Sequence, residues 1–232
     1  MHESTYPAAR PDNSTILPYI NKLPLMITAI AALSLFAFLS ASSNAGGEKA
    51  TILFFGDSIT AGYGLDPDQA FPALIQDRAD SLGIALETVN AGVSGETTAG
   101  GLRRVDWVLQ RPFDIFVLGL GGNDGLRGLD PDHTRENLQK IMDKVRENRP
   151  GVKIVLAGME APPNMGDEYT LRFRQVFQAL ADANDVVFMP FLLEDVAGIP
   201  EHNMPDGIHP TAGGHRIIAG NVWKVLEPLI AP

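Results

Sequence analysis

Short apolar runs alternate with longer amphipathic segments along this chain from residue 51 onward. The apolar runs have the length and composition of β-strands, and we expect strands at 51–55, 87–90, 114–118, 153–157 and 186–188. The amphipathic segments predict helices near 71–82, 97–110, 134–148, 168–184 and 211–229. Repeated strand–helix units require a mainly parallel sheet with helices on both faces. The sequence therefore predicts an α/β fold, a three-layer α/β/α sandwich around five strands.

This fold class also predicts where a site should lie. Right-handed crossovers place the loops that follow the strands along the carboxyl edge of the sheet, where open α/β sheets bind their ligands. The chain has 232 residues, 45% of them hydrophobic, which is enough for one domain with a substantial core. We expect a single catalytic domain over 51–232, preceded by a short linker at 46–50.

The N-terminal segment predicts export. Residues 23–40 carry no charge and are rich in Leu, Ile, Ala and Phe, and small residues follow at 41–46. This pattern indicates a signal peptide over 1–45, cleaved after Ala45, and hence a periplasmic or secreted protein without a membrane span after cleavage. An uncleaved membrane anchor is the alternative, because 18 apolar residues are at the short limit for a span.

Charge and cysteine content exclude several classes of protein. The formal charge of −10 argues against nucleic-acid partners, since phosphate binding needs clustered Lys and Arg. The chain has no cysteine, which excludes disulfides, thiolate metal sites and a cysteine nucleophile. Only oxygen nucleophiles remain for acyl transfer, and we expect a monomer that acts on a small-molecule or lipid ester.

Ser58 is the candidate nucleophile. It follows the first predicted strand after two residues, Gly56 and Asp57, so its hydroxyl should lie at the carboxyl edge, at the start of a helix. The segment is not the Gly-x-Ser-x-Gly elbow of α/β-hydrolases, because position 60 is Thr. Taken alone, Ser58 is equally well interpreted as a helix N-cap.

Asp206 and His209 are candidates for the rest of a catalytic triad. They lie three residues apart in a loop before the last predicted helix. A serine hydroxyl needs a base to remove its proton, and an imidazole is most effective when a carboxylate holds its other nitrogen. A capping aspartate and a surface histidine are the alternative. The spacing of His202, Asp206, His209 and His215 matches no known metal-ligand pattern, so we expect neither a metal nor a cofactor.

Two further loops offer donors for an oxyanion. Gly92 follows the second strand, where its backbone N–H could approach a substrate, and the side-chain amide of Asn123 follows the third. Taken alone, each residue is more typical of a turn, or in the case of Asn123 of a turn or a helix cap. Together with Ser58 and His209 they share one predicted sheet edge, which helix capping does not explain.

These residues resemble the consensus blocks of the SGNH hydrolases, also called the GDSL lipase/esterase family. The chain is most similar to the bacterial arylesterases and the multifunctional acyl-CoA thioesterase I / lysophospholipase L1 proteins. The resemblance rests on the segments 55–64, 121–128, 161–166 and 206–210, and extends from about residue 51 to 230.

The resemblance implies a flavodoxin-like SGNH hydrolase fold and a serine hydrolase that cleaves carboxylic esters and thioesters. It implies Ser58 as nucleophile, His209 as base and Asp206 as its orienting carboxylate. The oxyanion hole would consist of the Ser58 amide, the Gly92 amide and the Asn123 side chain, whereas Asp57 and Asp124 would brace the loops.

The substrate remains open between several esters. We expect the loops 125–129 and 160–166 to line the acyl pocket, and the substrate to contact Gly125, Leu126, Pro162, Pro163 and Ile208. Short-chain aryl esters, medium-chain thioesters and lysophospholipids all fit, and export favours esters over cytosolic acyl-CoA. A carbohydrate O-acetyl esterase is an alternative that the apolar loops disfavour. A non-catalytic binding protein is another, although the chain retains every residue of the expected triad.

Overall fold

The computed structural model describes residues 49–230. The predicted signal peptide or anchor at 1–45 lies outside the described residues, as does most of the linker at 46–50, and both stay predictions. Within the described part, no helix combines the length and the apolar character that a membrane crossing requires.

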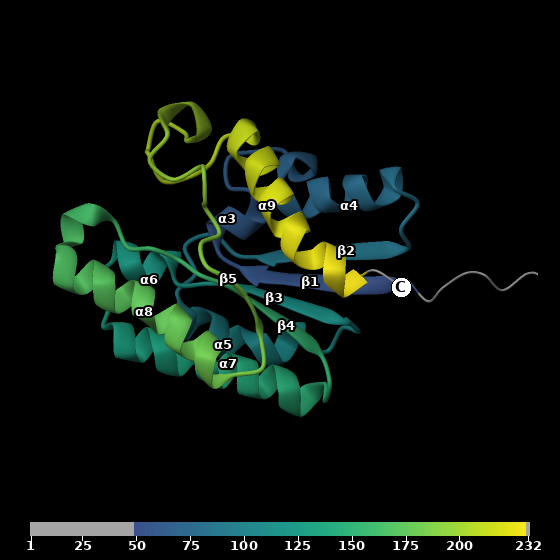
Figure 1. Cartoon of the computed structure of the whole chain (residues 1–232), viewed down its shortest axis with the longest axis horizontal. Coiled ribbons are helices and arrows are strands. Elements are labelled where there is room, and N and C mark those ends of the chain that lie inside the picture. The colour runs from purple at the N-terminus through teal and green to yellow at the C-terminus, as the bar shows by residue number, and fades with distance from the viewer. Residues whose placement is uncertain (1–48, 231–232) are drawn as a thin grey trace, which may run out of the picture. The chain divides into compact units, whose positions relative to one another are not determined.

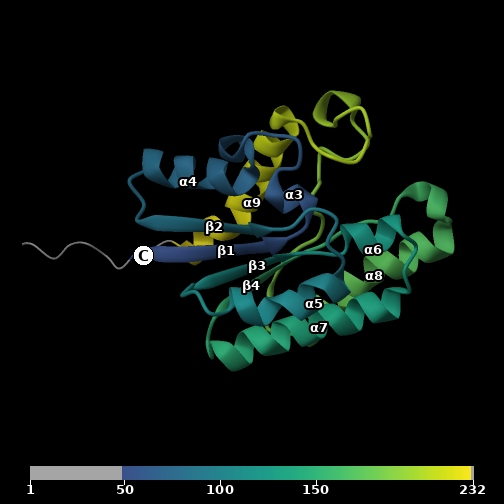
Figure 2. The ribbon, with the colours of Figure 1, turned by 180° about the vertical axis from the view of Figure 1, so that it is seen from behind.

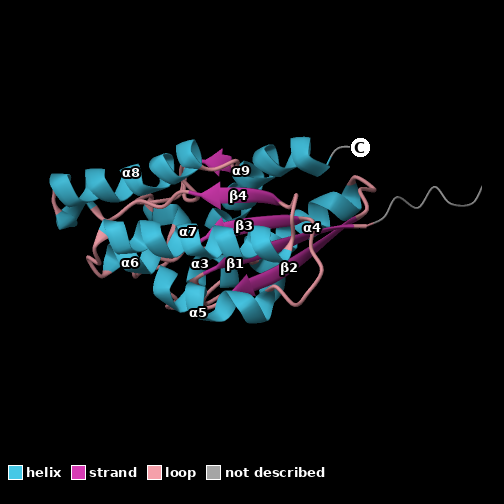
Figure 3. Cartoon of the chain, turned by 90° about the horizontal axis from the view of Figure 1, so that it is seen from below, coloured by secondary structure: helices cyan, strands magenta, loops and turns pink. Residues whose placement is uncertain are grey.

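A parallel sheet with the strand order β2-β1-β3-β4-β5 forms the centre of the fold (Figures 1 and 3). Its strands are β1 (Ala50–Gly56), β2 (Leu86–Gly92), β3 (Ile115–Gly119), β4 (Lys153–Ala157) and β5 (Val187–Met189). All four neighbouring pairs are parallel. The prediction of a parallel five-stranded sheet is confirmed, and every strand begins and ends within two residues of its expected bounds. The order is that of flavodoxin-like folds, in which the direction of winding reverses between β1 and β3.

Helices cover both faces of the sheet, as the apolar pattern predicted. The long helices are α4 (Phe71–Ser81), α5 (Thr98–Val108), α7 (Pro131–Asn148), α8 (Asp167–Ala183) and α9 (Ala212–Ile230). Helices α4 and α9 pack together on one face, and α5, α7 and α8 form the layer on the other (Figures 1 and 2).

The fold also contains single turns of helix. A helix was expected to start at Ser58, where α3 (Ser58–Ala61) begins, whereas the sequence did not predict α6 (Gly122–Leu126), η2 (Pro67–Gln69), η3 (Pro163–Met165) and η4 (Pro200–His202). Each is too short to show a helical period in its side chains.

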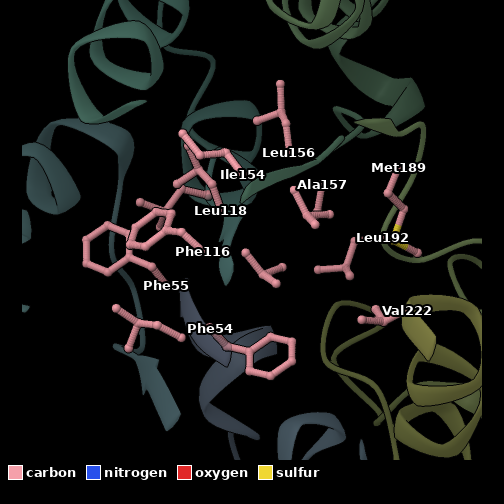
Figure 4. Packing of buried hydrophobic residues seen from close by; sticks show 14 of the residues in the cluster. Phe54, Phe55, Phe116, Leu118, Ile154, Leu156, Ala157, Met189, Leu192 and Val222 are labelled. Atoms are coloured by element: carbon pink, nitrogen blue, oxygen red, sulfur yellow. The ribbon is translucent and has the colours of Figure 1, made fainter. Parts of the chain in front are cut away.

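The packing of β1 explains why its residues are apolar at successive positions and do not alternate with polar ones. Phe54 packs edge-on against Phe71 of α4, with 5.4 Å between ring centroids. The next residue, Phe55, points to the opposite face, where it packs against Phe116 of β3 at 5.5 Å. Figure 4 shows Phe54, Phe55 and Phe116 within the buried cluster that also contains Leu118. Both faces of β1 are therefore buried, which requires apolar residues at successive positions.

A row of glycines ends the strands at the carboxyl edge. Gly56 of β1 pairs with Gly92 of β2 and with Gly119 of β3. A Cβ atom on Gly56 would lie 2.0 Å from Oγ1 of Thr60, and one on Gly92 would lie 2.3 Å from the backbone nitrogen of Ala61. Both contacts are far inside van der Waals distance. The absence of these side chains therefore lets α3 lie directly across the ends of the strands.

His215 connects the two helices of one layer. It lies in α9, is buried, and accepts a hydrogen bond at Nδ1 from the backbone N–H of Phe71, 3.1 Å away. Phe71 is the first residue of α4, where backbone N–H groups have no partner within the helix, and the N-cap residue Ala70 offers no side-chain acceptor. His215 therefore caps α4 from a helix 144 residues away in the sequence. Burial lowers the pKa of His215 to about 4.

We predict that His215 makes the fold sensitive to acid. Between its ordinary pKa near 6.5 and its folded pKa of about 4, the unfolded chain binds a proton that the folded chain does not, so stability falls as pH falls through this window. His215→Asn keeps an acceptor for Phe71 but cannot titrate. Urea unfolding should show that the wild type loses about 3 kcal/mol more than this variant between pH 7 and 4. The exposed His133→Asn variant is the control, and an equal loss in His215→Asn and the wild type would refute the assignment.

Candidate active site

Ser58 lies at the junction of β1 and α3. Asp57 is the N-cap of α3, because its Oδ1 accepts a hydrogen bond from the backbone N–H of Ile59 at 3.0 Å. Ser58 is therefore not the capping residue, which removes the alternative interpretation of this position. Its side chain is available for other contacts and lines a pocket at the carboxyl edge.

His209 connects Ser58 to Asp206. Nε2 of His209 lies 3.1 Å from Oγ of Ser58, and its Nδ1 lies 2.7 Å from Oδ2 of Asp206. With Nδ1 carrying the proton that is donated to Asp206, Nε2 can accept the proton of the serine hydroxyl. The structure thus brings together three predicted residues, two of which are 151 positions apart.

Asp206 is held in its charged form by its own loop. The backbone N–H of His209 donates to Oδ1 at 3.0 Å and that of Ile208 at 2.9 Å. The His209 backbone N–H, the His209 ring and then the Ile208 N–H hold the pKa of Asp206 down at about 2. Asp206 does not cap α9, since Oγ1 of Thr211 accepts from the N–H of Gly214 there. Its side chain thus directs one oxygen to the loop and the other to the imidazole.

Asp57 occupies a different environment, beside Asn123. The side chain is buried, and its Oδ2 accepts a hydrogen bond from Nδ2 of Asn123 at 3.5 Å. Burial raises the pKa of Asp57 to about 6, against the lowering effects of the Ile59 N–H and the Asn123 amide. Asp57 therefore links the loop after β1 to the loop after β3.

Asp124 is a buried anchor for the loop that carries Asn123. Its carboxylate accepts hydrogen bonds from the backbone N–H of Thr98 at 2.9 Å and from Oγ1 of Thr98 at 2.5 Å. Oγ1 of Thr134 lies 3.4 Å from the same carboxylate. Asp124 thus connects α6 to the first turns of α5 and α7.

Gly92 ends β2, and Gly95 lies in the loop that follows; the two backbone N–H groups differ in their hydrogen bonding. The backbone N–H of Gly92 already donates to Oδ1 of Asn90 at 3.0 Å, so the predicted oxyanion donor is occupied. Gly95 lies three residues further on, with φ of 77°, in a turn closed by the Glu96 N–H and the Val93 carbonyl. Among residues 49–230, the Gly95 N–H has no hydrogen-bond acceptor. Gly95 was not predicted from the sequence, although the Ser94-Gly95 dipeptide shortly after a predicted strand is typical of a turn.

A partly buried ion pair holds this loop against α5. Arg104 of α5 contacts the carboxylate of Glu96 and donates to the carbonyl of Ala91 at 3.0 Å. The guanidinium also lies 4.3 Å from the centre of the Phe55 ring. The loop is therefore connected to both the helix behind it and the core of the sheet.

The pocket beside Ser58 has a volume of about 510 Å³. Of the predicted substrate-binding residues, Leu126, Pro162, Pro163 and Ile208 line it. Gly125 does not; it lies behind the wall, where an added Cβ would be 3.2 Å from Phe173. Apolar residues that were not predicted also line it, among them Met159, Phe191, Leu193 and Ala197 from the segments after β4 and β5.

A charged pair also borders this pocket, of which Glu160 belongs to the expected loop and Arg174 was not predicted. Nε of Arg174 lies 2.8 Å from Oε1 of Glu160, and both residues line the pocket.

Across residues 49–230, no group of three or more His, Cys, Asp or Glu side chains is placed to hold a metal ion.

Comparison with known proteins places the chain in a family. The model of the GDSL-like lipase/acylhydrolase family matches residues 54–217. The esterase TesA of Pseudomonas aeruginosa is 41% identical over 182 residues, which cover 78% of this chain and 89% of the relative. The thioesterase 1/protease 1/lysophospholipase L1 of Escherichia coli K12 is 36% identical and covers 78% of this chain and 85% of its own.

A solved structure extends the comparison to the fold. The psychrotrophic esterase EstA from a Pseudoalteromonas species, inhibited by monoethylphosphonate, superposes with a TM-score of 0.73 at 30% identity. The match covers 77% of this chain and 97% of that structure. The chain therefore belongs to the GDSL-like lipase/acylhydrolase (SGNH hydrolase) family and is an ester hydrolase.

Proposed function

We propose that this ester hydrolase works through a Ser58-His209-Asp206 triad and a covalent acyl-enzyme. The observation that carries the proposal is the continuous series of contacts from Oγ of Ser58 through both nitrogens of His209 to Asp206. This arrangement provides a nucleophile, a base within reach of its proton and a carboxylate that fixes the tautomer of the base. The phosphonate-inhibited relative supports the proposal, since a tetrahedral phosphonate resembles the intermediate of acyl transfer.

In the first step, Oγ of Ser58 attacks the ester carbonyl carbon while Nε2 of His209 takes the hydroxyl proton. The carbonyl oxygen becomes an oxyanion, and the imidazolium that forms is stabilised by the charged carboxylate of Asp206. When the oxyanion collapses, the bond to the leaving group breaks and Nε2 returns its proton to that group. The acyl group is then bound to Ser58.

In the second step, water replaces the leaving group. Nε2 of His209 takes a proton from the water as its oxygen attacks the acyl carbon, and a second oxyanion forms. Its collapse breaks the bond to Oγ of Ser58, which recovers its proton from His209. The carboxylic acid leaves and the site is restored.

We propose that three groups donate to the oxyanion. The Ser58 N–H, at the first position of α3, has no acceptor among the described residues, and the Asn123 side chain lines the same pocket. For the third donor we replace Gly92 by Gly95, because the Gly92 amide is held by Asn90. Donors that are fixed before the reaction stabilise charge as it develops, without reorganisation.

The pocket supports a substrate with an apolar acyl group. Its volume is within the range of small-molecule sites, and its wall is mainly apolar. Such a wall suits short to medium acyl chains and argues against a sugar cleft, so an O-acetyl esterase of carbohydrates is disfavoured. The names of the relatives include both esterase and lysophospholipase activities. Export on the predicted signal peptide would bring the enzyme to esters and lysophospholipids, and keep it from cytosolic acyl-CoA.

We predict that Ser58→Ala abolishes turnover. Removal of the nucleophile should lower kcat on p-nitrophenyl acetate by about 10⁴-fold or more, because no acyl-enzyme can form. A fluorophosphonate probe should label the wild type at Ser58 and leave the variant unlabelled, as shown by intact mass. Activity at the wild-type level in Ser58→Ala would refute the proposed nucleophile.

We predict a smaller loss on removal of the Asn123 amide. Asn123→Ala should lower kcat by about 10²- to 10³-fold on p-nitrophenyl esters, the usual effect of one oxyanion donor. Asn221→Ala, on the outer side of α9, is the matched control, since its amide contacts only the Glu194 carbonyl and Lys224. If the two alanine variants had equal kcat, Asn123 would not be a donor.

We predict that Arg174 limits the length of the acyl chain. Arg174→Ala removes a long side chain from the pocket wall and should raise kcat/KM for p-nitrophenyl decanoate relative to the butyrate. We expect a rise of about fourfold to fifteenfold, equal to burying one or two more methylenes at about 0.8 kcal/mol each. Arg172→Ala is the control, because Arg172 lies on the same helix but pairs with Asp130 and Asp132 outside the pocket. An unchanged chain-length profile in Arg174→Ala would contradict the prediction.

A further inference from the structure

The ring of Tyr63 lies against the ring of His209. The two centroids are 4.4 Å apart and the ring planes are inclined by 37°. Tyr63 is half exposed, so this contact is not part of the buried core. The hydrolytic mechanism above assigns no role to the residue.

Tyr63 is positioned by the backbone of the candidate nucleophile. Its backbone N–H donates to the carbonyl oxygen of Ser58 at 3.0 Å, just after α3 ends. Its side chain then reaches His209, whose Nε2 contacts the hydroxyl of the same Ser58. Ser58, Tyr63 and His209 thus form a closed cycle of contacts.

We propose that Tyr63 is a positioning residue that holds the His209 imidazole in place and stabilises its protonated form. The inference rests on the proposed Ser58-His209-Asp206 mechanism and adds a group that this mechanism lacks. It adds an aromatic face to the two groups, Ser58 and Asp206, that contact the nitrogens of the base.

The geometry of the imidazole explains why a face contact is needed. Both hydrogen bonds of the His209 ring, to Ser58 and to Asp206, are made through its nitrogens and act in the ring plane. Neither of them prevents the ring from tilting about the line between its partners. Tyr63 contacts the face and opposes this tilt.

The charge of the imidazole supplies a second reason. His209 becomes an imidazolium whenever it holds the serine or the water proton, and the π face of an aromatic ring attracts a cation. Asp206, on the same loop, is the carboxylate in contact, and its side chain is 41% exposed, so water competes for its charge. Asp57, before α3, is the other charged group that acts on His209. Asp206 acts at the ring nitrogen Nδ1, whereas Tyr63 adds its attraction at the ring face.

The test compares two substitutions at position 63. Tyr63→Phe keeps the aromatic face and loses only the hydroxyl, whereas Tyr63→Leu keeps apolar bulk and loses the face. Both side chains suit a half-exposed position, and thermal unfolding checks that the fold is retained. The measurement is kcat/KM against pH, on p-nitrophenyl acetate and on an alkyl ester such as ethyl butyrate.

Tyr63→Phe should keep the wild-type pH profile and kcat. Tyr63→Leu should lower kcat by about threefold to tenfold and move the acid limb of the profile down by about half a pH unit, because a less stabilised imidazolium loses its proton at lower pH. The shift should be the same for both esters, since it belongs to the base and not to the leaving group. A matched control is Trp107→Leu, which removes an exposed aromatic side chain on α5 and should change neither quantity.

Three outcomes overturn the proposal. They are an unmoved acid limb in Tyr63→Leu, an equal defect in Tyr63→Phe, and a loss confined to the aryl ester, which would make Tyr63 a contact for the leaving group. Ser58→Ala, assayed alongside, distinguishes a failure of the proposed triad from a failure of the role proposed for Tyr63. If its activity remains, the triad is wrong; if its activity is lost while Tyr63→Leu behaves as the wild type, only the role of Tyr63 fails.

Discussion

The close approach of α3 to the ends of the parallel strands is the constraint on which the site depends. Gly56 and Gly92 have no room for a Cβ, because Thr60 and the Ala61 backbone occupy that space. This contact fixes Ser58 at the point where the sheet reverses its direction of winding, between β1 and β3. A side chain at either glycine would displace the helix turn, and with it the hydroxyl that His209 contacts.

Much of this arrangement could be predicted from the sequence, for physical reasons. A strand buried on both faces needs an uninterrupted apolar run, so β1 and β3 could be recognised from their own residues, without knowledge of the neighbouring strands. Parallel strands with right-handed crossovers bring their carboxyl ends to one edge, so Ser58 and Asn123 were expected near each other. The loop with His209 lies before a long amphipathic helix whose start was also evident.

What the sequence could not supply is the direction of individual groups. The amide of Gly92 was expected to face the site, but Asn90, two residues before it, occupies that amide with its own side chain. The contact of Tyr63 with His209 joins two loops, and the pairing of Glu160 with Arg174 joins a loop to α8. No periodic pattern in the sequence encodes the side-chain rotamers that these contacts need. Proximity follows from topology, whereas orientation depends on local hydrogen bonds.

Two carboxylates near His209 show how environment divides the roles proposed here. Asp206 is partly exposed, and the His209 N–H, the His209 ring and the Ile208 N–H lower its pKa to about 2, so it stays charged in mild acid. Asp57 is buried, and burial raises its pKa to about 6.

A charged Asp206 can therefore stabilise the imidazolium at every working pH. Asp57 instead becomes neutral in mild acid, while its Oδ1 caps α3 and its Oδ2 holds the Asn123 amide. Environments that separate the pKa values of neighbouring acids commonly mark a division of labour. Here the solvated Asp206 supports the base, and the buried Asp57 holds α3 and Asn123, which position the nucleophile and an oxyanion donor.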